Sequence, residues 1–488
     1  MSKNNTKRSL LASVFALVLC VAMLVGSTFA WFTDTASTGV NKIVSGNLKV
    51  DIVGENSDTH VDELKFTKAA AADAEASAEV LWEPGCRYLT EGFRIANKGN
   101  LALKWKAQVN KGATAANANH ADLLDVIDFY LVTSKNANDM GTALDEFSGN
   151  LTAGAKSDVY YIKGVMKTTA GNDYQGLTLD GISITVVATQ DTVENDSFNN
   201  QYDKDAEYPI LVTTGDQLQA TVNNATAPVN IVLANSITTN NFVIPADKDV
   251  TLDLNGRTVT NAGSHTILNK GHLTLTDSST DKSGQIISLK GNTAALRNGD
   301  NAVCVVEGGT ISRDGANGNT WHVVENFGKM TFNGGKVVLK NGNGFAITNG
   351  WNYFDPGAST THAVMEINAL ELDTDSSGIK NCRYGDLTVN DVTVTSTGYW
   401  ALSNDYLGTA VINGGTLTSN SFKAVSNGAA MTVNGGTFNG TQGFFVQSYA
   451  TSTVLNGGTF ANMNVDALSS YVGTGHTAQQ NGTSVIIK

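Results

Sequence analysis

The sequence predicts an all-β protein in two parts, a jelly-roll-like antiparallel β-sandwich followed by a solenoid of parallel strands. Gly and Asn together supply about a fifth of the 488 residues, which indicates many turns with a positive φ. Short segments of alternating apolar and polar residues are typical of half-buried strands. In the second half, one module repeats about every 22 residues. With 41% hydrophobic and only 16% charged residues, the chain can bury real cores.

The N-terminus has the pattern of a secretory signal peptide. A basic start is followed by an uncharged apolar stretch from Leu10 to Val25 and by small residues at Thr28 and Ala30. An apolar core of about 16 residues is short for a retained membrane anchor, the alternative, because spanning needs about 20. We therefore assign residues 1–30 to a signal peptide, cleaved between Ala30 and Trp31, and expect a secreted protein.

The net charge and the cysteine content argue against several classes of partner and of bound metal. The formal net charge is −13, and it becomes more negative without the basic leader. This argues against nucleic acid or an anionic membrane surface as a partner. Cys86, Cys304 and Cys382 would remain after cleavage, and their odd number and wide spacing argue against a disulfide framework or a zinc site. We expect no cofactor and no bound metal.

Residues 31–203 are expected to form the sandwich. Alternating segments predict short strands, and a Pro84-Gly85 turn introduces two of them. A short helix within residues 121–133 is expected to run into the strand Phe129–Val132. The predicted strands are 45–52, 93–101, 105–109, 129–132, 160–162 and 182–188. Seven or so short strands over this length favour a sandwich or jelly roll.

The same landmarks, in this order, resemble the TasA/camelysin family of exported biofilm-matrix proteins. The resemblance covers residues 1 to about 200. It implies a jelly-roll domain, processing by a SipW-type signal peptidase in a Gram-positive-type bacterium, and self-association into extracellular fibres through the N-terminal domain. The matching pieces are Thr28-Phe29-Ala30-Trp31-Phe32, Ser45-Gly46-Asn47-Leu48, Pro84-Gly85, the set Asn97, Gly99, Leu101 and Leu103, and Val187-Ala188-Thr189-Gln190.

Some camelysin relatives are described as metallopeptidases, but the residues do not support that activity here. The sequence has no His-Glu-x-x-His, which would place two zinc ligands and a general base on one face of a helix. Its seven histidines are isolated from one another, at positions 60, 120, 265, 272, 322, 362 and 476.

A polar, acidic segment separates the two parts. Residues 191–205 are rich in Asp and Glu, which supply the oxygen ligands of a calcium site, but we favour a solvated linker. Thr214 could cap a short helix that carries Leu218 and Val222 on one face. We assign residues 204–250 to a linker and solenoid cap, and residues 251–488 to the solenoid.

The solenoid prediction depends on two recurring asparagine positions. Asn390, Asn413, Asn434 and Asn456 introduce turns, mostly Gly-Gly, at intervals of about 22 residues. A second asparagine follows a short apolar stretch in each copy, and Gln447 takes its place in the last. These asparagines are Asn269, Asn298, Asn326, Asn349, Asn381, Asn404 and Asn427.

A period this short, with about three strands per unit, fits a solenoid and excludes helical repeats. The region resembles a right-handed parallel β-helix of the pectate-lyase-like type. One Asn per turn would form a vertical column with a spacing of about 4.8 Å, in which each amide donates to the next turn. About ten turns would give a rod of roughly 50 Å.

Proteins of this β-helix class include polysaccharide lyases and glycoside hydrolases, which form the enzymatic alternative. Such chemistry needs clustered carboxylates on neighbouring turns. The column just before each ladder Asn should face outward, and it contains one acid. It consists of Arg297, Glu325, Thr348, Lys380, Ser403 and Ser426. The best catalytic candidates are instead Asp373, Asp375, Asp386 and Asp391, near Arg383, but they lie at different phases of the repeat.

Aromatic residues suggest a surface for sugars. Trp351, Tyr353 and Phe354 lie in the longest insertion, and Trp400 lies just before a ladder Asn. Exposed rings on a rigid rod could stack on sugar faces and bind a glycan or cell-surface ligand. Alternatively, Trp400 belongs to the core and the insertion packs only on itself.

We interpret the sequence as a secreted, non-enzymatic extracellular-matrix or adhesin-like protein. Its sandwich would supply assembly and its rod would present a binding surface.

Overall fold

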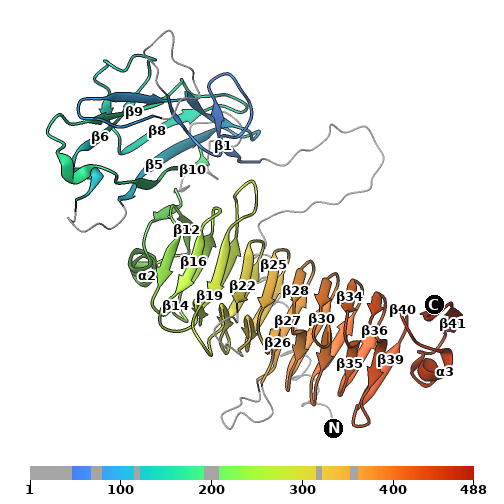
Figure 1. Ribbon diagram of the computed structural model, residues 1–488. Helices are drawn as coiled ribbons and strands as arrows, with labels where there is room; N and C mark the ends of the chain where they lie inside the picture. The colour runs from blue at the N-terminus through green and yellow to red at the C-terminus, as the bar shows by residue number, and fades with distance from the viewer. Residues whose placement is uncertain (1–46, 68–79, 115–120, 192–207, 315–320, 352–360) are drawn as a thin grey trace, which may run out of the picture. The chain divides into compact units, whose positions relative to one another are not determined.

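The computed structural model describes residues 47–67, 80–114, 121–191, 208–314, 321–351 and 361–488. The predicted cleavage site at Ala30 and Trp31 lies outside these residues. The described chain is all-β, with antiparallel sheets in its N-terminal region and a long parallel solenoid after them (Figure 1). The described helical elements are η1 (Leu123–Asp125), η2 (Asn172–Tyr174), α2 (Gly215–Asn224), α3 (Val465–Leu468) and η4 (Ser469–Tyr471).

Three antiparallel sheets make up the N-terminal region. One pairs β1 (Val50–Gly54) with β4 (Phe93–Asn97). A second has the order β10 (Leu179–Gln190), β5 (Leu103–Thr114), β8 (Glu146–Leu151). The third has the order β2 (Phe66–Thr67), β3 (Arg87–Thr90), β9 (Tyr161–Met166), β6 (Ile127–Val132), β7 (Thr142–Ala143).

An aromatic and aliphatic core lies among these strands. The indole of Trp105 is buried and meets the ring of Phe147 edge-on, with the centroids 5.7 Å apart. The predicted strands 129–132 and 182–188 fall inside β6 and β10. The short helix expected before β6 is a single 3-10 turn. Asp122 caps this turn by accepting a hydrogen bond from the backbone N–H of Leu124, and the chain is extended again from Ile127.

Residues 210–460 form a parallel β-solenoid of about ten turns, as the repeat predicts. Each turn contributes one strand to each of three sheets, and successive turns pair in parallel register. The first sheet contains β11 (Ile210–Val212), β12 (Val229–Leu233), β15 (Asp249–Asp253), β18 (His272–Thr276), β21 (Val303–Val306), β24 (Lys329–Phe332), β27 (Ala363–Ile367), β30 (Gly385–Val389), β33 (Thr409–Ile412), β36 (Ala430–Val433) and β39 (Ser452–Leu455).

The second and third sheets follow the same order along the rod. The second sheet contains β13 (Ile237–Thr239), β16 (Thr258–Asn261), β19 (Gln285–Ser288), β22 (Thr310–Asp314), β25 (Lys336–Lys340), β28 (Glu371–Thr374), β31 (Thr393–Ser396), β34 (Thr416–Ser419), β37 (Thr437–Asn439), β40 (Gly458–Phe460), β42 (Ser484–Ile487) and β41 (Ala478–Asn481). The third sheet contains β14 (Phe242–Ile244), β17 (Ile267–Asn269), β20 (Leu296–Asn298), β23 (Val324–Asn326), β26 (Phe345–Asn349), β29 (Ser377–Asn381), β32 (Leu402–Asn404), β35 (Lys423–Asn427) and β38 (Gln442–Val446).

The seven asparagines singled out in the sequence end the strands of the third sheet, and their side chains are fully buried inside the solenoid. Each Nδ2 donates to the Oδ1 of the next Asn along the rod, at 2.7–2.9 Å in all six steps. The same amides also donate to backbone carbonyls of the corner, as Asn381 does to Gly385 and Thr409. The ladder therefore satisfies the polar groups of a tight buried turn.

A second amide ladder runs along the surface at the corner between the first and second sheets. It uses the asparagines that introduce the turns, and its Nδ2 groups donate in the opposite direction, toward the N-terminal turns. Glu307, Asn333, Asn368, Asn390, Asn413, Asn434 and Asn456 form it, with steps of 2.7–2.9 Å. The sequence pattern reveals most of these positions, but it misses Asn368, which no Gly-Gly pair follows.

The Gly-Gly pairs at this corner have a steric reason. Gly415 has a φ of 95°, and a Cβ added there would lie 2.6 Å from the carbonyl oxygen of Val392 on the preceding turn. Only glycine tolerates both the backbone conformation and this close approach.

The first solenoid strands lie within the segment that the sequence assigns to a linker and cap. β12, β13 and β14 already pair in parallel with β15, β16 and β17. The pattern did not reveal this turn because Ile244 occupies the place of a ladder Asn, in register with Asn269. The predicted helix is present as α2, with Thr214 as its N-cap and Leu218 and Val222 buried.

Both ends of the solenoid are covered. At the N-terminal end, the side-chain amide of Gln219 in α2 accepts from the N–H and donates to the C=O of Val243, both at 2.8 Å, and so occupies the edge of β14. At the C-terminal end, β42 reverses direction and pairs antiparallel with β40, and α3 contributes the buried Leu468 to the core. Exposed sheet edges invite further pairing, and these caps limit it.

The two ladders predict different costs of truncation. Asn381→Ala should reduce the free energy of unfolding by about 3 kcal/mol, because it leaves buried amide and carbonyl groups without partners. Asn413→Ala, the matched change in the surface ladder, should cost less than about 1 kcal/mol because water replaces the lost bonds. Denaturant unfolding monitored by circular dichroism measures both. Equal losses would contradict the structural role assigned to the buried ladder.

Candidate functional site

The outer face of the third sheet carries the column that precedes the buried ladder. Parallel pairing places its members side by side on successive turns. The column consists of Arg297, Glu325, Thr348, Lys380, Ser403 and Ser426. The expected alignment is therefore present, and the chemistry of this face can be described turn by turn.

This column is far less exposed than its outward direction predicts. Thr348, Ser403 and Ser426 are buried, and Glu325 is only 3% exposed. Arg297 Nη1 lies 3.0 Å from Glu325 Oε2, and its guanidinium lies over the ring of Phe327 at 4.6 Å. Side chains from the turns at both edges of the sheet pack against the column, which alternation along a strand does not reveal.

Buried charges gather at the N-terminal end of this face. Arg313 is 1% exposed, and burial lowers its pKa to about 10, while the carboxylate of Glu325 acts in the opposite direction. Burial also raises the pKa of Glu325, against the effect of Arg297. Perturbed pairs of this kind often mark functional sites. Here, however, the carboxylate and the Arg313 guanidinium hardly reach solvent, so they cannot contact a large ligand.

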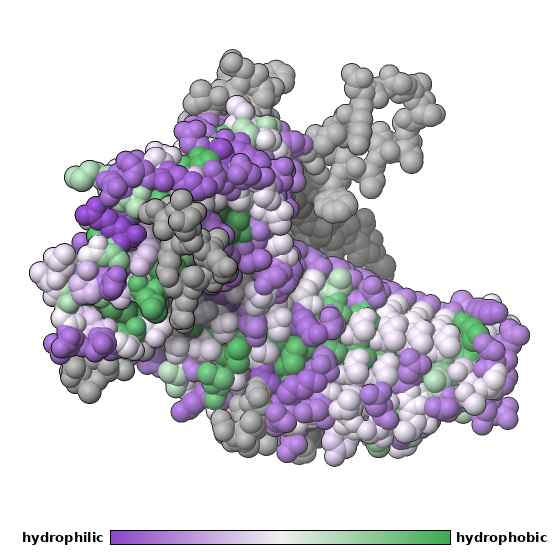
Figure 2. Space-filling model, turned by 45° about the horizontal axis from the view of Figure 1, so that its top comes forward, coloured by the Kyte–Doolittle hydropathy of each residue, from purple (hydrophilic) through white to green (hydrophobic). Residues whose placement is uncertain are grey.

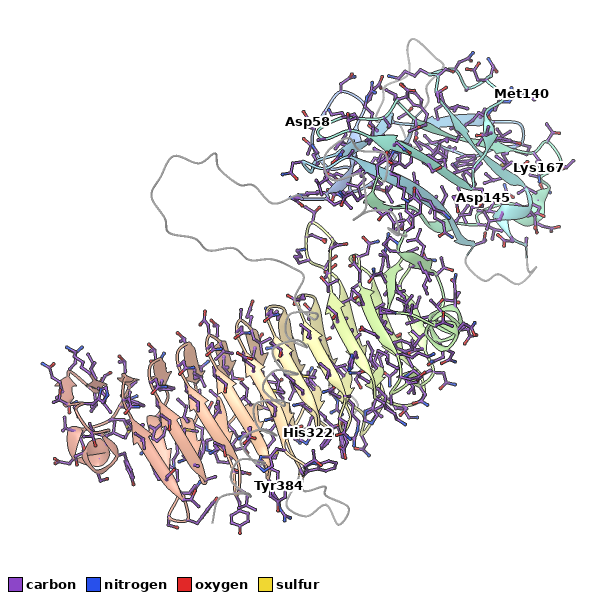
Figure 3. The ribbon with its side chains drawn as sticks, turned by 180° about the vertical axis from the view of Figure 1, so that it is seen from behind. Asp58, Met140, Asp145, Lys167, His322 and Tyr384 are labelled. Carbon is purple, nitrogen blue, oxygen red and sulfur yellow. The ribbon has the colours of Figure 1, made fainter. Side chains whose placement is uncertain are left out.

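Two histidines act as neutral acceptors in the corner between the second and third sheets. Nδ1 of His265 accepts from the N–H of Ala294 at 2.9 Å, and Nδ1 of His322 accepts from the N–H of Phe345 at 3.2 Å. Burial, aided by Lys380 and Arg313, lowers the pKa of His322 to about 4. Figure 3 shows His322 on the same long side of the solenoid as Tyr384.

Toward the C-terminus the column stays buried, but the polar groups beside it are partly exposed. Lys380 Nζ lies 2.9 Å from Asp405 Oδ2, and Ser403 Oγ donates to Asp405 Oδ1 at 2.9 Å. One turn further, Gln447 Nε2 donates to Ser426 Oγ at 3.1 Å. The buried serines thus orient polar groups that themselves remain partly open to solvent.

Exposed tyrosines border this part of the face. Tyr399 lies in the turn before β32, Tyr406 in the turn after it, and Tyr449 in the turn after β38. Their exposed fractions are 56%, 47% and 56%. We call this region, defined by these tyrosines with Asp405 and Gln447, the tyrosine-bordered face. On the side shown in Figure 2, the C-terminal half of the solenoid is mostly of intermediate hydropathy, and residues 401–488 carry only four charged side chains.

The rings singled out in the sequence have different surroundings. Trp351 is 8% exposed and packs on Phe327, with ring centroids 4.5 Å apart. Trp400 is half-buried and meets Phe422 edge-on at 5.3 Å. Tyr353 and Phe354 lie outside the described residues. The sequence argument missed Tyr399, Tyr406 and Tyr449, although Tyr399 directly precedes Trp400 and the repeat places all three in turns.

The acids of the enzymatic alternative do not meet. Asp373 lies on the second sheet and pairs with Lys340 at 2.8 Å, whereas Asp386 lies on the first sheet and pairs with His362 at 2.9 Å. Asp375 accepts from the N–H of Asn341 in the corner between the second and third sheets, and Asp391 follows β30 at the surface corner. These carboxylates therefore belong to separate surfaces of the rod.

The described residues contain neither a metal-binding cluster nor a membrane-spanning helix. Within the described ranges, no group of three or more His, Cys, Asp or Glu side chains could hold a metal ion. Most of the acidic 191–205 segment falls outside those ranges. Of the helices that the structure describes, none has the length and apolar character needed to cross a membrane.

Comparisons with protein-family models, with curated proteins and with solved structures each found no match. The solenoid and its surfaces are therefore the basis for assigning a function.

The neutral state of His322 predicts an acid-sensitive solenoid. Its pKa is about 4 in the folded chain and about 6.5 when unfolded, so the stability it contributes is complete above pH 6.5 and is lost as the pH falls toward 4. Between pH 8 and pH 5 the free energy of unfolding should drop by about 2 kcal/mol from this residue. His322→Gln should remove that part of the pH dependence, and the exposed control His272→Gln should not. Unfolding titrations at both pH values test this, and an unchanged pH dependence in His322→Gln would exclude it.

Proposed function

We propose that this chain is an exported structural protein of the extracellular matrix or cell surface. Its solenoid would be a rigid scaffold that presents a binding surface and would not be an enzyme. The observation that carries the proposal is the pair of amide ladders. In them, the most regularly repeated polar side chains of the solenoid bond to one another and hold successive turns together. The acids that could support glycan cleavage lie on different sheets. A stiff rod whose last 88 residues carry only four charged side chains suits presentation and adhesion.

Capped ends support an assembly role for the N-terminal region. Gln219 occupies the edge of β14, and β42 with α3 covers the last turn. Solenoids of this chain would therefore not elongate by stacking end to end. If the protein forms fibres, as the resemblance to the TasA/camelysin family implies, the contacts would involve residues 31–203, which we propose to be a jelly-roll-like sandwich.

An edge suited to such a contact is present among the described strands. β10 runs for 12 residues, pairs with β5 and lies at the edge of its sheet. An extended segment added to a sheet edge needs only main-chain hydrogen bonds. We propose that the segment from Trp31 onward, freed by a SipW-type signal peptidase, supplies this strand to a neighbouring copy outside a Gram-positive-type cell.

Filament formation tests this proposal directly. Purified protein beginning at Trp31 should form filaments in electron micrographs, and deletion of residues 31–45 should abolish them. A chain with residues 31–45 scrambled separates sequence from length, and we expect it to fail like the deletion. Undiminished filaments from the deleted protein would exclude strand donation by this segment.

A further inference from the structure

Exposed aromatic rings are concentrated at one place on the described chain. Among the large hydrophobic side chains that the described residues expose, the only aromatic ones are Tyr399, Tyr406 and Tyr449. All three belong to the tyrosine-bordered face. Scattered exposed hydrophobic residues need no explanation, but clustered ones mark interaction sites.

Two of these rings, those of Tyr399 and Tyr449, contact neighbouring groups. The ring of Tyr399 contacts Trp400 and Phe422, with centroids 6.1 Å and 6.0 Å apart. The ring of Tyr449 lies against Gly428 of the preceding turn, where an added Cβ would approach it to 2.7 Å. Rings fixed before binding lose little entropy when a ligand arrives.

The polar groups between the rings suit hydroxyl-bearing ligands. The carboxylate of Asp405 and the ammonium of Lys380 form one close pair, so together they add no net charge, and Gln447 offers an amide. Lys423 lies over the ring of Phe445 at 3.1 Å from its centroid. A few oriented polar groups among aromatic rings are typical of small-molecule and sugar recognition.

We propose that the tyrosine-bordered face binds an extended neutral glycan that runs along the rod. This inference rests on the proposed presenting function and names its ligand class. Tyr399 and Tyr406 flank one turn, and Tyr449 lies two turns away, which is about 10 Å along the solenoid. That separation allows rings to stack on successive sugar residues while Asp405, Lys380 and Gln447 bond their hydroxyls.

The net charge and the position of this face argue against anionic polymers and peptides as its ligands. The chain carries a formal net charge of −13, which repels nucleic acid and polyanionic glycans. On the face itself the Lys380 charge is matched by Asp405, and Lys423 lies against the ring of Phe445. An extended peptide normally binds at a sheet edge, whereas Tyr399, Asp405 and Tyr406 flank β32, which is paired on both sides by β29 and β35.

The test measures binding of the full mature chain to defined oligosaccharides by calorimetry. The probes are cello-, laminari-, manno- and chito-oligosaccharides, with oligogalacturonate as the anionic probe. The variant Tyr399→Ala with Tyr449→Ala should weaken binding of the best neutral probe at least about tenfold. Tyr399→Phe with Tyr449→Phe keeps both rings and should stay within about twofold. Val454→Ala changes an exposed side chain on the first sheet and serves as the matched control.

Three results would overturn the proposal. They are the absence of binding to every neutral probe, binding unaffected by the double alanine variant, and preference for oligogalacturonate with a steep loss of affinity in salt. Circular dichroism confirms folding of each variant, and the exposure of both tyrosines makes unfolding unexpected. Filament formation is assigned to the N-terminal region and glycan binding to the solenoid. A failure of glycan binding therefore leaves the proposal of filament formation intact, and a failure of filament formation leaves the proposal of glycan binding intact.

Discussion

The hydrogen-bonded column of buried asparagine amides is the interaction on which the rest of the solenoid depends. The corner between the third and first sheets is tight, and its carbonyl groups face inward where water cannot reach them. Each Asn satisfies them and also donates to the Asn of the next turn. Because one amide must meet the next at hydrogen-bond distance, the turns cannot slip relative to one another. This constraint fixes the outer columns too, and so places Lys380, Ser403 and the tyrosine-bearing turns in line.

The sequence was informative where a residue type has one structural use. Asparagine after an apolar stretch and paired glycines at a corner recur because few other residues fit, so the ladder and the parallel solenoid could be predicted. The first turn could not, because Ile244 packs in the core where other turns bond through Asn. Asn368 joins the surface ladder without the glycines that mark its neighbours. In the first case Ile244 replaces the ladder Asn, and in the second Ala369 and Leu370 replace the Gly-Gly pair. Both replacements are compatible with the solenoid turn.

The candidate site was harder to predict because exposure depends on neighbouring turns. Alternation places Glu325 and Ser426 on the outside of a strand, yet side chains from adjacent turns bury them. Trp351 was a reasonable candidate for sugar stacking, but its ring packs on Phe327. The exposed rings belong to turns, whose direction no period in the sequence encodes. The buried charges and the exposed tyrosines thus lie toward opposite ends of the third-sheet face, consistent with the proposed role in presentation.

The central physical claim is that stacked amides hold the turns in register, and side-chain hydrogen exchange tests it most directly. With asparagine-selective 15N labelling and assignment by single substitutions, NMR can follow the NH2 groups of the seven ladder residues. We predict exchange at least about a thousandfold slower than for the amides of the surface ladder, because a buried, doubly bonded donor opens only when turns separate. Equal exchange rates in the two ladders would contradict the account.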